Sequence, residues 1–453
     1  MAPKHIHFVG IGGISLSALA TILHKNQFVV SGSDCTQSKL TDKLISMGIN
    51  VYIGHNESNV NGADLIVYSS AIKPENCELK EAQRLNIPIV SRADMLGTIA
   101  SAHNKIISVS GSHGKTTTTG MIATIFLLAR KNPTIHIGGI LPQIKGNVLS
   151  GGKDYFITEA CEYCDSFLSL KSYYSIVLNV QKDHMDYFKN MSNLQKSFEK
   201  FAKNTNNNGF LVINADDENC KKLKTESNII SYGIKNNAIV CAKQIKANNK
   251  QQFSFSLYVC GIKLTRIKLS VSGRHNIYNS LAAIAVAISE GIKIKYIKRA
   301  LKTYKTSERR FEQIKGNKAI VVHDYAHHPT EIAASISTAK NMCKGKLIVA
   351  FEPHTYSRTS YLFKEFSKCF SGADKLILCP IYPAREAPIK NITSQRLANA
   401  VAKEGVNVQC VQSLDECFNK LKLYNKKGNF ILLLGAGTIE KLCKNFKEKI
   451  NNQ

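Results

Sequence analysis

The sequence predicts an α/β protein of about three domains, and three observations support this fold class. Short apolar runs of strand length alternate with helix-length segments along almost the whole chain of 453 residues. Glycine-rich turns follow two of these runs and precede helices, as in parallel sheets with crossover helices. Polar clusters follow several other runs, and ligands bind at that edge of open α/β sheets.

The first section, residues 1–97, begins with a strand, a glycine turn, a helix and a second strand. These four elements are expected at residues 5–9, 10–15, 16–23 and 28–34. Asp34 ends the second strand about 20 residues after the turn, as in dinucleotide-binding folds. Ser15 stands where the third glycine of that fingerprint would be. The pattern predicts a Rossmann-like domain, although this signal alone is weak.

The second section, residues 98–305, is predicted to be a P-loop ATPase-like domain. A strand-like run at 106–108 leads into Gly111-Ser112-His113-Gly114-Lys115-Thr116-Thr117, and an apolar helix is expected at 121–129. Loop N–H groups and a helix N-terminus attract an anion, Lys115 can reach the β- and γ-phosphates, and Thr116 can bind Mg²⁺. Val109 stands where a standard P-loop has its first glycine, so the loop is a shorter variant.

A phosphate loop needs a metal partner beyond Thr116, and two residues of the same section are candidates. Glu159 ends a strand expected at 154–158, where P-loop proteins place their metal-binding acid. His184 is expected to end a neighbouring strand and could bind a second metal, although Mg²⁺ prefers oxygen ligands. The alternatives are a solvated loop acid at Glu159 and a hydrogen-bonded loop histidine at His184.

The third section, residues 306–453, predicts a second Rossmann-like domain. Polar or glycine-rich residues follow the strands expected at 319–322, 347–351, 376–378 and 430–434. The run from Asp324 to His328 could be a binding cluster or the start of a helix with Pro329 in its first turn. Arg310 and Arg358 are candidate anion clamps, although a lone arginine is more often a surface residue.

Composition narrows the function classes. The net charge of +27 comes mostly from dispersed lysines without a dense basic tail, which favours compositional drift together with a polyanionic small-molecule substrate over a nucleic-acid partner. No apolar run approaches the ~20 residues that span a bilayer, and no signal peptide is expected. The thirteen scattered cysteines suit reduced thiols, and the Cys161–Cys164 pair alone is a weak metal or redox motif. A cytoplasmic protein without a membrane partner is therefore expected.

The order and content of these motifs resemble the Mur ligase family. The matching pieces are Gly10-Ile11-Gly12-Gly13, Ser69-Ser70-Ala71-Ile72, Ser91 to Leu96, Gly111 to Thr117, Glu159-Ala160, Ser166-Phe167-Leu168, Asn179 to His184, Gly273 to Asn276, Arg309-Arg310-Phe311, Asp324 to Glu331, Pro353 to Arg358, Tyr382 to Glu386 and Gly435-Ala436-Gly437. Each piece is modest evidence, but the whole series in this order is specific.

The resemblance implies an ADP-forming amide ligase of peptidoglycan synthesis that uses ATP and Mg²⁺. It would join L-alanine to the lactyl carboxylate of UDP-N-acetylmuramate through an acyl phosphate, as a monomer or weak homodimer. The implied UDP-substrate residues are Gly12, Gly13, Ser15, Ser70 and Arg92. The implied ATP residues are 111–117, Asn276, Asn279, Arg310 and Asp324. The implied metal ligands are Thr116, Glu159 and His184, and the implied alanine residues are Tyr325, His327 and Arg358. The implied catalytic residues are Lys115, Glu159, His184 and Arg310.

Some positions depart from the family pattern, and other functions stay open. The departures are Ser15, Asp94, Ser112, Cys161, Cys164 and His323. They affect fine substrate contacts and leave the reaction class unchanged. A sister ligase that adds a preformed peptide to UDP-N-acetylmuramate would share most of the ATP site. The Lys115 loop argues against a dehydrogenase that uses the first glycine turn for NAD. Intact Lys115, Glu159 and His184 argue against a catalytically silent nucleotide-binding protein.

Overall fold

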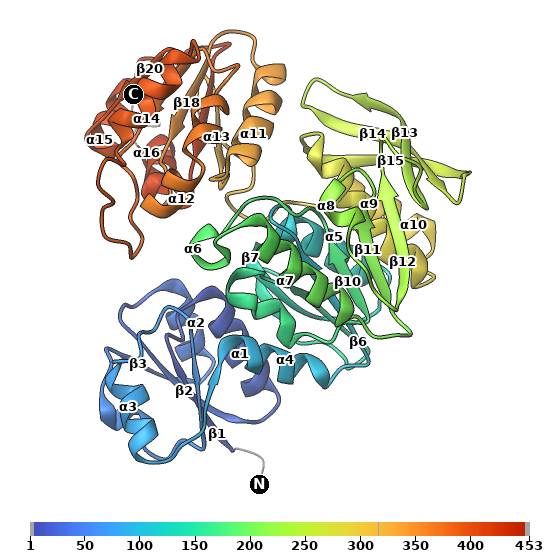
Figure 1. Ribbon diagram of the computed structural model, residues 1–453, viewed down its shortest axis with the longest axis vertical. Helices are drawn as coiled ribbons and strands as arrows, with labels where there is room; N and C mark the ends of the chain where they lie inside the picture. The colour runs from blue at the N-terminus through green and yellow to red at the C-terminus, as the bar shows by residue number, and fades with distance from the viewer. Residues whose placement is uncertain (1–3, 316, 449–453) are drawn as a thin grey trace. The chain divides into compact units, whose positions relative to one another are not determined.

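The computed structural model describes residues 4–315 and 317–448 (Figure 1). By the contacts within it, the chain divides into two compact units. The first unit comprises Met1–Val180, Gln195–Val240 and Ala282–Ala300. The second unit comprises Gln181–Leu194, Cys241–Leu281 and Leu301–Gln453. The predicted α/β class is confirmed in both, whereas the predicted domain limits at 97/98 and 305/306 stay predictions.

The first unit begins with a parallel sheet in the strand order β3-β2-β1-β4-β5. Its strands are β1 (His5–Val9), β2 (Val29–Asp34), β3 (Asn50–Ile53), β4 (Leu65–Tyr68) and β5 (Ile89–Ser91). The helices between and after them are α1 (Ile14–Lys25), α2 (Lys39–Ser46), α3 (Cys77–Arg84) and α4 (Arg92–Ser101). The chain leaves β1 for β2 on one side and later returns to β4 on the other. The glycine turn after β1 therefore lies at a topological switch point, where such sheets bind ligands.

The same unit contains a second sheet, whose strands run in the order β12-β11-β10-β6-β9-β7-β8. They are β6 (Lys105–Ser110), β7 (Thr134–Leu141), β8 (Gly146–Leu149), β9 (Tyr155–Glu159), β10 (Tyr174–Val177), β11 (Phe210–Asn214) and β12 (Asn228–Gly233). Neighbouring strands are parallel except β7 and β8. The first of the strands, β6, lies between β9 and β10, so its carboxyl end is again a switch point.

Helix α5 (Lys115–Leu128) follows β6 and is buried from Thr116 to Phe126. The residues of this stretch point to all sides of the helix, so protein covers α5 all round, as it covers buried helices. The apolar pattern of the sequence predicted that α5 begins at residue 121. The helix begins six residues earlier because Gly114, with a φ of 86°, ends the loop as the N-cap of α5.

The second unit contains strands β13 (Val240–Ala247), β14 (Gln252–Val259) and β15 (Ile262–Ser272), of which β14 and β15 form an antiparallel pair. Helix α9 (His275–Ser289) follows β15. A further sheet has the strand order β16-β17-β21-β18-β19-β20. Its strands are β16 (Glu312–Ile314), β17 (Ile320–Asp324), β18 (Leu347–Phe351), β19 (Lys375–Leu378), β20 (Val408–Cys410) and β21 (Phe430–Leu434).

Helices cover both faces of this last sheet, which is parallel except for β16. One core contains Val349 with apolar residues of α11 (Pro329–Met342), α13 (Phe363–Lys368) and α14 (Ser394–Lys403). The other contains Ile348 with residues of α15 (Leu414–Lys422) and α16 (Lys441–Glu448). Successive strand residues thus enter opposite cores, as in a doubly wound sheet. In the described part of the chain, no helix combines the length and apolarity needed to cross a membrane.

Candidate functional site

The phosphate loop, residues 111–117, joins β6 to α5 in a conformation that requires glycine. Gly111 has a φ of 132°, and a Cβ atom there would lie 3.0 Å from the Leu178 Cβ and 3.1 Å from the Asn179 N. Asn179 also holds the loop from outside. Its carbonyl oxygen accepts a hydrogen bond from Ser112 N at 3.1 Å, and its Oδ1 accepts one from His113 N at 2.9 Å. The loop is therefore shaped before any anion arrives.

The Lys115 side chain lies against its own loop and a buried carboxylate. Its Nζ donates to the Gly111 carbonyl oxygen at 2.6 Å and to the Glu162 Oε2 at 2.9 Å. The Glu162 side chain is only 1% exposed. Sequence reasoning missed this partner, although its spacing of three residues from Glu159 was a usable signal. The charge of Lys115 is thus already balanced in this conformation.

The expected pairing of Thr116 with Glu159 is present. The Thr116 hydroxyl donates to the Glu159 Oε2 at 3.0 Å, and the Gly138 N donates to the other carboxylate oxygen at 2.6 Å. A Cβ atom on Gly138 would lie 3.0 Å from that oxygen, so glycine lets the backbone approach the carboxylate. Two hard oxygen ligands consequently lie together at the N-terminus of α5, as a magnesium site requires.

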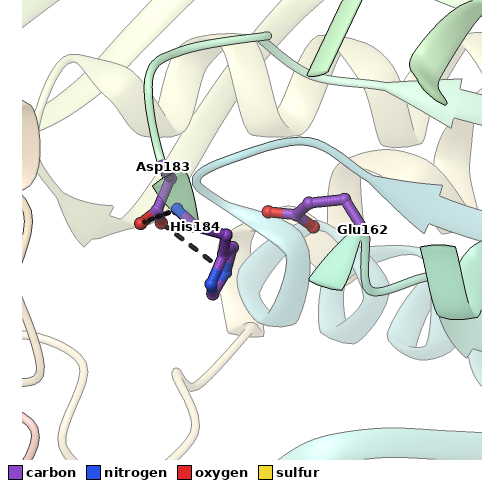
Figure 2. A group of neighbouring side chains, drawn as sticks. All are labelled: Glu162, Asp183 and His184. Atoms are coloured by element: carbon purple, nitrogen blue, oxygen red, sulfur yellow. Dashed lines mark hydrogen bonds and ion pairs between the residues drawn. The ribbon is translucent and has the colours of Figure 1, made fainter. Parts of the chain in front are cut away.

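His184 does not end a strand, so that prediction was wrong. Strand β10 ends at Val177, and His184 is the N-cap of the short helix α6 (Met185–Phe188), with a φ of 53°. Local polar bonds impose this turn, because the Asp183 Oδ1 accepts from the His184 N at 2.8 Å. Figure 2 shows Asp183 beside His184, with dashed lines for the interactions between these two residues.

Asp183 and Arg358 form a buried ion pair within the second unit. The Arg358 Nη2 donates to the Asp183 Oδ1 at 3.1 Å, and both side chains are about one-tenth exposed or less. Burial would raise the pKa of Asp183, but the Arg358 guanidinium and neighbouring histidines outweigh it and hold that pKa well below its usual range. The other arm of Arg358 contacts the His354 Nδ1 at 3.2 Å.

Tyr325, His327 and Arg358, the three residues expected at an alanine site, are brought together. The His327 ring lies 5.3 Å from the Tyr325 ring and 5.8 Å from the His354 ring. Its Nδ1 contacts the Tyr325 carbonyl oxygen at 2.9 Å, which fixes the proton on Nδ1. Burial and the Arg358 charge lower the pKa of His327 to about 3, so the ring is neutral. Sequence reasoning missed Asp183 and His354 as members of this cluster.

Arg310 and Asp324 lie beside the same cluster. The Arg310 guanidinium stacks over the Tyr325 ring at 4.9 Å, and its Nη1 is 3.9 Å from the Glu331 Oε1. Asp324 ends β17 and accepts a hydrogen bond from the Ser335 hydroxyl at 2.5 Å. Burial raises the pKa of Asp324 to about 6, although Ser335 and Arg310 oppose the rise. Pro329 begins α11, so the predicted helix start after this cluster is confirmed.

The two asparagines expected near adenine lie one turn apart in α9. The Asn279 Nδ2 donates to the Asn276 Oδ1 at 2.9 Å, and the Asn276 Nδ2 donates to the Ser272 carbonyl oxygen at 2.7 Å. Both side chains are buried. The helix begins at His275, so both residues lie inside its first turns.

In the first unit, Asp34 holds the glycine turn at residues 10–15 by a hydrogen bond. The Asp34 Oδ2 accepts from the Gly12 N at 2.9 Å, and a Cβ atom on Gly12 would lie 2.8 Å from the same oxygen. Gly13 is the N-cap of α1, and Ser15 lies in its first turn. The Arg92 Nη1 donates to the Ser15 Oγ at 3.4 Å. Ser15 and Arg92 are therefore brought together, whereas Ser70 is an exposed residue after β4.

The cysteines give no support to metal or redox chemistry at the Cys161–Cys164 pair. All thirteen cysteines are free thiols. Burial, followed by the nearby Glu162 carboxylate, raises the pKa of Cys161 above its usual value. A raised pKa disfavours the thiolate, which is the form that binds metals and attacks disulfides.

Three family models match the chain in the order of the sequence. The model described as Mur ligase family, catalytic domain, matches residues 5–104. The Mur ligase middle domain matches residues 109–287, and the Mur ligase, glutamate ligase domain, matches residues 309–437. Together they account for most of the chain.

Individual relatives match over nearly full length. A protein of Clostridium acetobutylicum named UDP-N-acetylmuramate–L-alanine ligase is 44% identical over 98% of both chains. A protein of the same name from Clostridium tetani is 42% identical over 97% of this chain and 96% of its own. The crystal structure of UDP-N-acetylmuramate-alanine ligase from Thermotoga maritima, 28% identical, covers 99% of both chains with a TM-score of 0.84. This chain therefore belongs to the Mur ligase family.

Proposed function

We propose that this chain joins L-alanine to the lactyl carboxylate of UDP-N-acetylmuramate at the expense of ATP, a step of peptidoglycan synthesis. The observation that carries the proposal is 44% identity over 98% of a relative that is named for this reaction. The phosphate loop with Lys115 and Thr116 at the N-terminus of α5 supplies the site that ATP needs.

The chemistry must overcome the poor reactivity of a carboxylate toward an amine. A carboxylate oxygen attacks the γ-phosphorus of ATP, the bond to the β-phosphate oxygen breaks, and ADP leaves. The resulting acyl phosphate is attacked by the neutral amine of alanine. The tetrahedral intermediate then expels inorganic phosphate and loses the amine proton. Both reacting groups carry negative charge at first, so charge neutralisation is the main catalytic need.

Lys115 is the residue proposed to neutralise the transferred phosphoryl group. Its ammonium is held by the Gly111 carbonyl and Glu162, so it stays inside the loop before ATP binds. On ATP binding, the phosphate oxygens would compete with Glu162 for the same three N–H donors. Arg310, stacked on Tyr325, is a second cation proposed to act on the phosphates.

The Thr116 and Glu159 oxygens fit a magnesium ion, and we propose that they hold one. The Gly138 N–H fixes the Glu159 carboxylate with one oxygen still directed at Thr116. Mg²⁺ would offset the negative charge of the phosphates when it is bound. His184 is the proposed ligand of a second ion, and the ring is set by its place at the start of α6.

The alanine subsite is proposed to consist of Arg358, His327 and Tyr325. Arg358 would bind the alanine carboxylate, and Asp183 and His354 hold its guanidinium in one orientation. The His327 Nδ1 is engaged with the Tyr325 carbonyl, so its Nε2 is the acceptor. A neutral acceptor there suits the alanine amine, which must lose a proton before it attacks.

Phosphate release from MgATP tests this proposal. We expect release only when UDP-N-acetylmuramate and L-alanine are both present, and a loss of about 100-fold or more in Lys115→Ala. Lys80→Ala, which changes an exposed lysine of α3, is the matched control and should keep wild-type activity. Phosphate release that requires a peptide in place of L-alanine would instead support the function of the sister ligase, which adds a preformed peptide. No release with any amino acid or peptide would overturn the ligase function.

A further inference from the structure

A buried histidine of β7 connects the glycine turn with the strand that carries Glu159. His136 is 4% exposed. Its Nε2 lies 2.9 Å from the Ser15 Oγ, and its Nδ1 lies 2.9 Å from the Thr158 Oγ1. All of these residues lie within the first unit. No role in binding or catalysis follows for His136 from the motifs described above.

All the contacts of His136, Thr158, Ser15 and Arg92 are satisfied together when their hydrogen bonds run in one direction. The Thr158 hydroxyl donates its single proton to the Glu159 carbonyl oxygen at 3.0 Å, so its oxygen accepts from the His136 Nδ1–H. The imidazole then carries no proton on Nε2, and that nitrogen accepts from the Ser15 hydroxyl. The Ser15 oxygen, whose proton is engaged, is left to accept from the Arg92 Nη1.

The imidazole must stay neutral for this arrangement to exist. Burial, followed by the positive charge of Arg92, lowers the pKa of His136 to about 3. A protonated ring would have no acceptor for Ser15 and would repel Arg92. Above pH 5 the ring therefore holds Ser15 and Arg92 in one fixed pattern.

A second buried side chain anchors the same turn of α1. The Asn147 Nδ2 from β8 donates to the Ile14 carbonyl oxygen at 2.5 Å and to the Ser17 Oγ at 3.5 Å. Asn147 is 2% exposed. The antiparallel pair β7–β8 thus holds the first turn of α1 by two side chains, one of which contacts Ser15.

We propose that His136 is a positioning residue for UDP-N-acetylmuramate: its neutral imidazole accepts the hydrogen bond of the Ser15 hydroxyl and so fixes the Ser15 oxygen and the Arg92 guanidinium beside the glycine turn. This inference rests on the proposed function, and it takes the glycine turn and Arg92, which the family resemblance implies for the UDP substrate, to receive the diphosphate of that substrate. Arg92 is then presented to the diphosphate already oriented, which reduces the entropy lost on binding. His136 itself touches neither substrate nor reacting atoms.

Steady-state kinetics with each substrate varied in turn test the proposal. We expect His136→Val to raise the KM for UDP-N-acetylmuramate roughly fivefold to thirtyfold, because Ser15 loses its buried acceptor. The kcat and the KM values for ATP and L-alanine should stay within about twofold of wild type. His136→Gln should recover part of the loss, since its amide oxygen can accept from Ser15. His103→Val, which removes another partly buried histidine of the first unit, is the control.

A double-mutant cycle separates positioning from simple packing. Ser15→Gly removes the hydroxyl, so Ser15→Gly/His136→Val should raise the KM by much less than the product of the two single effects. Multiplicative effects would overturn the proposal, as would equal changes in all three KM values or an unchanged KM in His136→Val. If His136→Val does not fold, the cycle is run with His136→Gln.

A spectroscopic readout is independent of turnover. In wild-type protein labelled with ¹⁵N in histidine, we expect the His136 ring to be neutral at pH 6 with its proton on Nδ1. An imidazolium, or a proton on Nε2, would overturn the hydrogen-bond direction. If the wild type lacks ligase activity, the proposed function fails. If the wild type is active and the KM of His136→Val is unchanged, only this inference fails.

Discussion

At the scale of single residues, the site is built from side chains whose partners are already in place. Glu159 is held by Thr116 and Gly138, and Lys115 by Glu162. Such preorganisation stabilises charge without rearrangement during the reaction. The hydrogen-bond partners of each side chain therefore indicate which second residue a substitution will disturb.

Glu159→Gln is expected to weaken magnesium binding. The amide keeps the shape of the side chain but removes the negative charge that a divalent cation needs. We expect the magnesium concentration for half-maximal activity to rise about tenfold or more, with a fall in kcat. Titration of activity with Mg²⁺ at fixed ATP measures both.

The control for that titration is Glu218→Gln, which changes an exposed acid of the same unit. It should titrate with magnesium like wild type. An unchanged magnesium dependence in Glu159→Gln would remove Glu159 from the proposed metal site.

Asp183→Asn is expected to disturb L-alanine binding through Arg358. The asparagine keeps the size of the side chain but leaves the buried guanidinium without its carboxylate. We expect the KM for L-alanine to rise roughly tenfold, since a charge-assisted hydrogen bond contributes about 1.5–3 kcal/mol. The KM for UDP-N-acetylmuramate should change by less than about twofold, and kinetics with each substrate varied will show whether the two KM values separate.

At the scale of elements, the strands whose ranges were predicted from the sequence match the structure to within two residues at each end. Strands β18 and β21 begin and end as expected, because each is an apolar run bounded by polar or turn residues. The beginning of α5 was predicted too late. Its first turn carries polar residues of the phosphate loop, which hide the apolar pattern on which the prediction depended.

The candidate site was only partly predictable for a similar reason. Residues such as Lys115, Glu159 and Arg358 could be identified from the sequence, because they stand in recognisable loop motifs. Other members of the site contribute only through contacts with residues that are distant in the sequence or lie across a sharp turn, and the sequence does not reveal such contacts. These members are Glu162, Asp183, His354 and His136. The position of His184 was misjudged because β10 ends at Val177 and the hydrogen bond from the His184 N to the Asp183 Oδ1 turns the chain before α6.

Gly111→Ala is expected to damage the turn between β6 and α5. The backbone there has a φ of 132°, and the added Cβ would meet Leu178 and Asn179. We expect the free energy of unfolding to fall by about 1–3 kcal/mol and ATP binding to weaken. Gly48→Ala is the matched control, because Gly48 also has a positive φ, of 88°, but its Cβ would enter open space. Chemical denaturation of both variants should show the larger loss at Gly111.

At the scale of the whole molecule, several buried ionisable groups make stability depend on pH. Burial lowers the pKa of His136 to about 3 and that of His323 to about 4. For Glu78, burial acts to raise the pKa, but hydrogen bonds from His7, Ser33, Asn59 and His55 lower it to about 2. In all three cases the unfolded chain binds protons at a higher pH than the folded chain, so stability falls as pH falls.

The two kinds of group act in different pH windows. The histidines contribute their full stabilisation above about pH 6.5 and lose it below that value, about 2 kcal/mol each by pH 5. Glu78 contributes above its unfolded pKa of 4.5 and loses its share as the pH falls toward 2. Urea denaturation at pH 7, 6 and 5 should show a steady loss of stability, and His323→Phe should show a shallower one. A pH-independent free energy of unfolding over this range would contradict the buried neutral histidines.

Strand β7 carries two contacts that lie two residues apart, His136 toward Ser15 and the Gly138 N–H toward Glu159. If the diphosphate binds at the first contact and the lactyl carboxylate reacts near the second, one strand positions two groups of a single substrate molecule. The strand then sets the distance between the positions of these two groups. A UDP-sugar without the lactyl group would still bind at the His136–Ser15 contact but would bring no carboxylate to Glu159. It would therefore inhibit the enzyme and would not react.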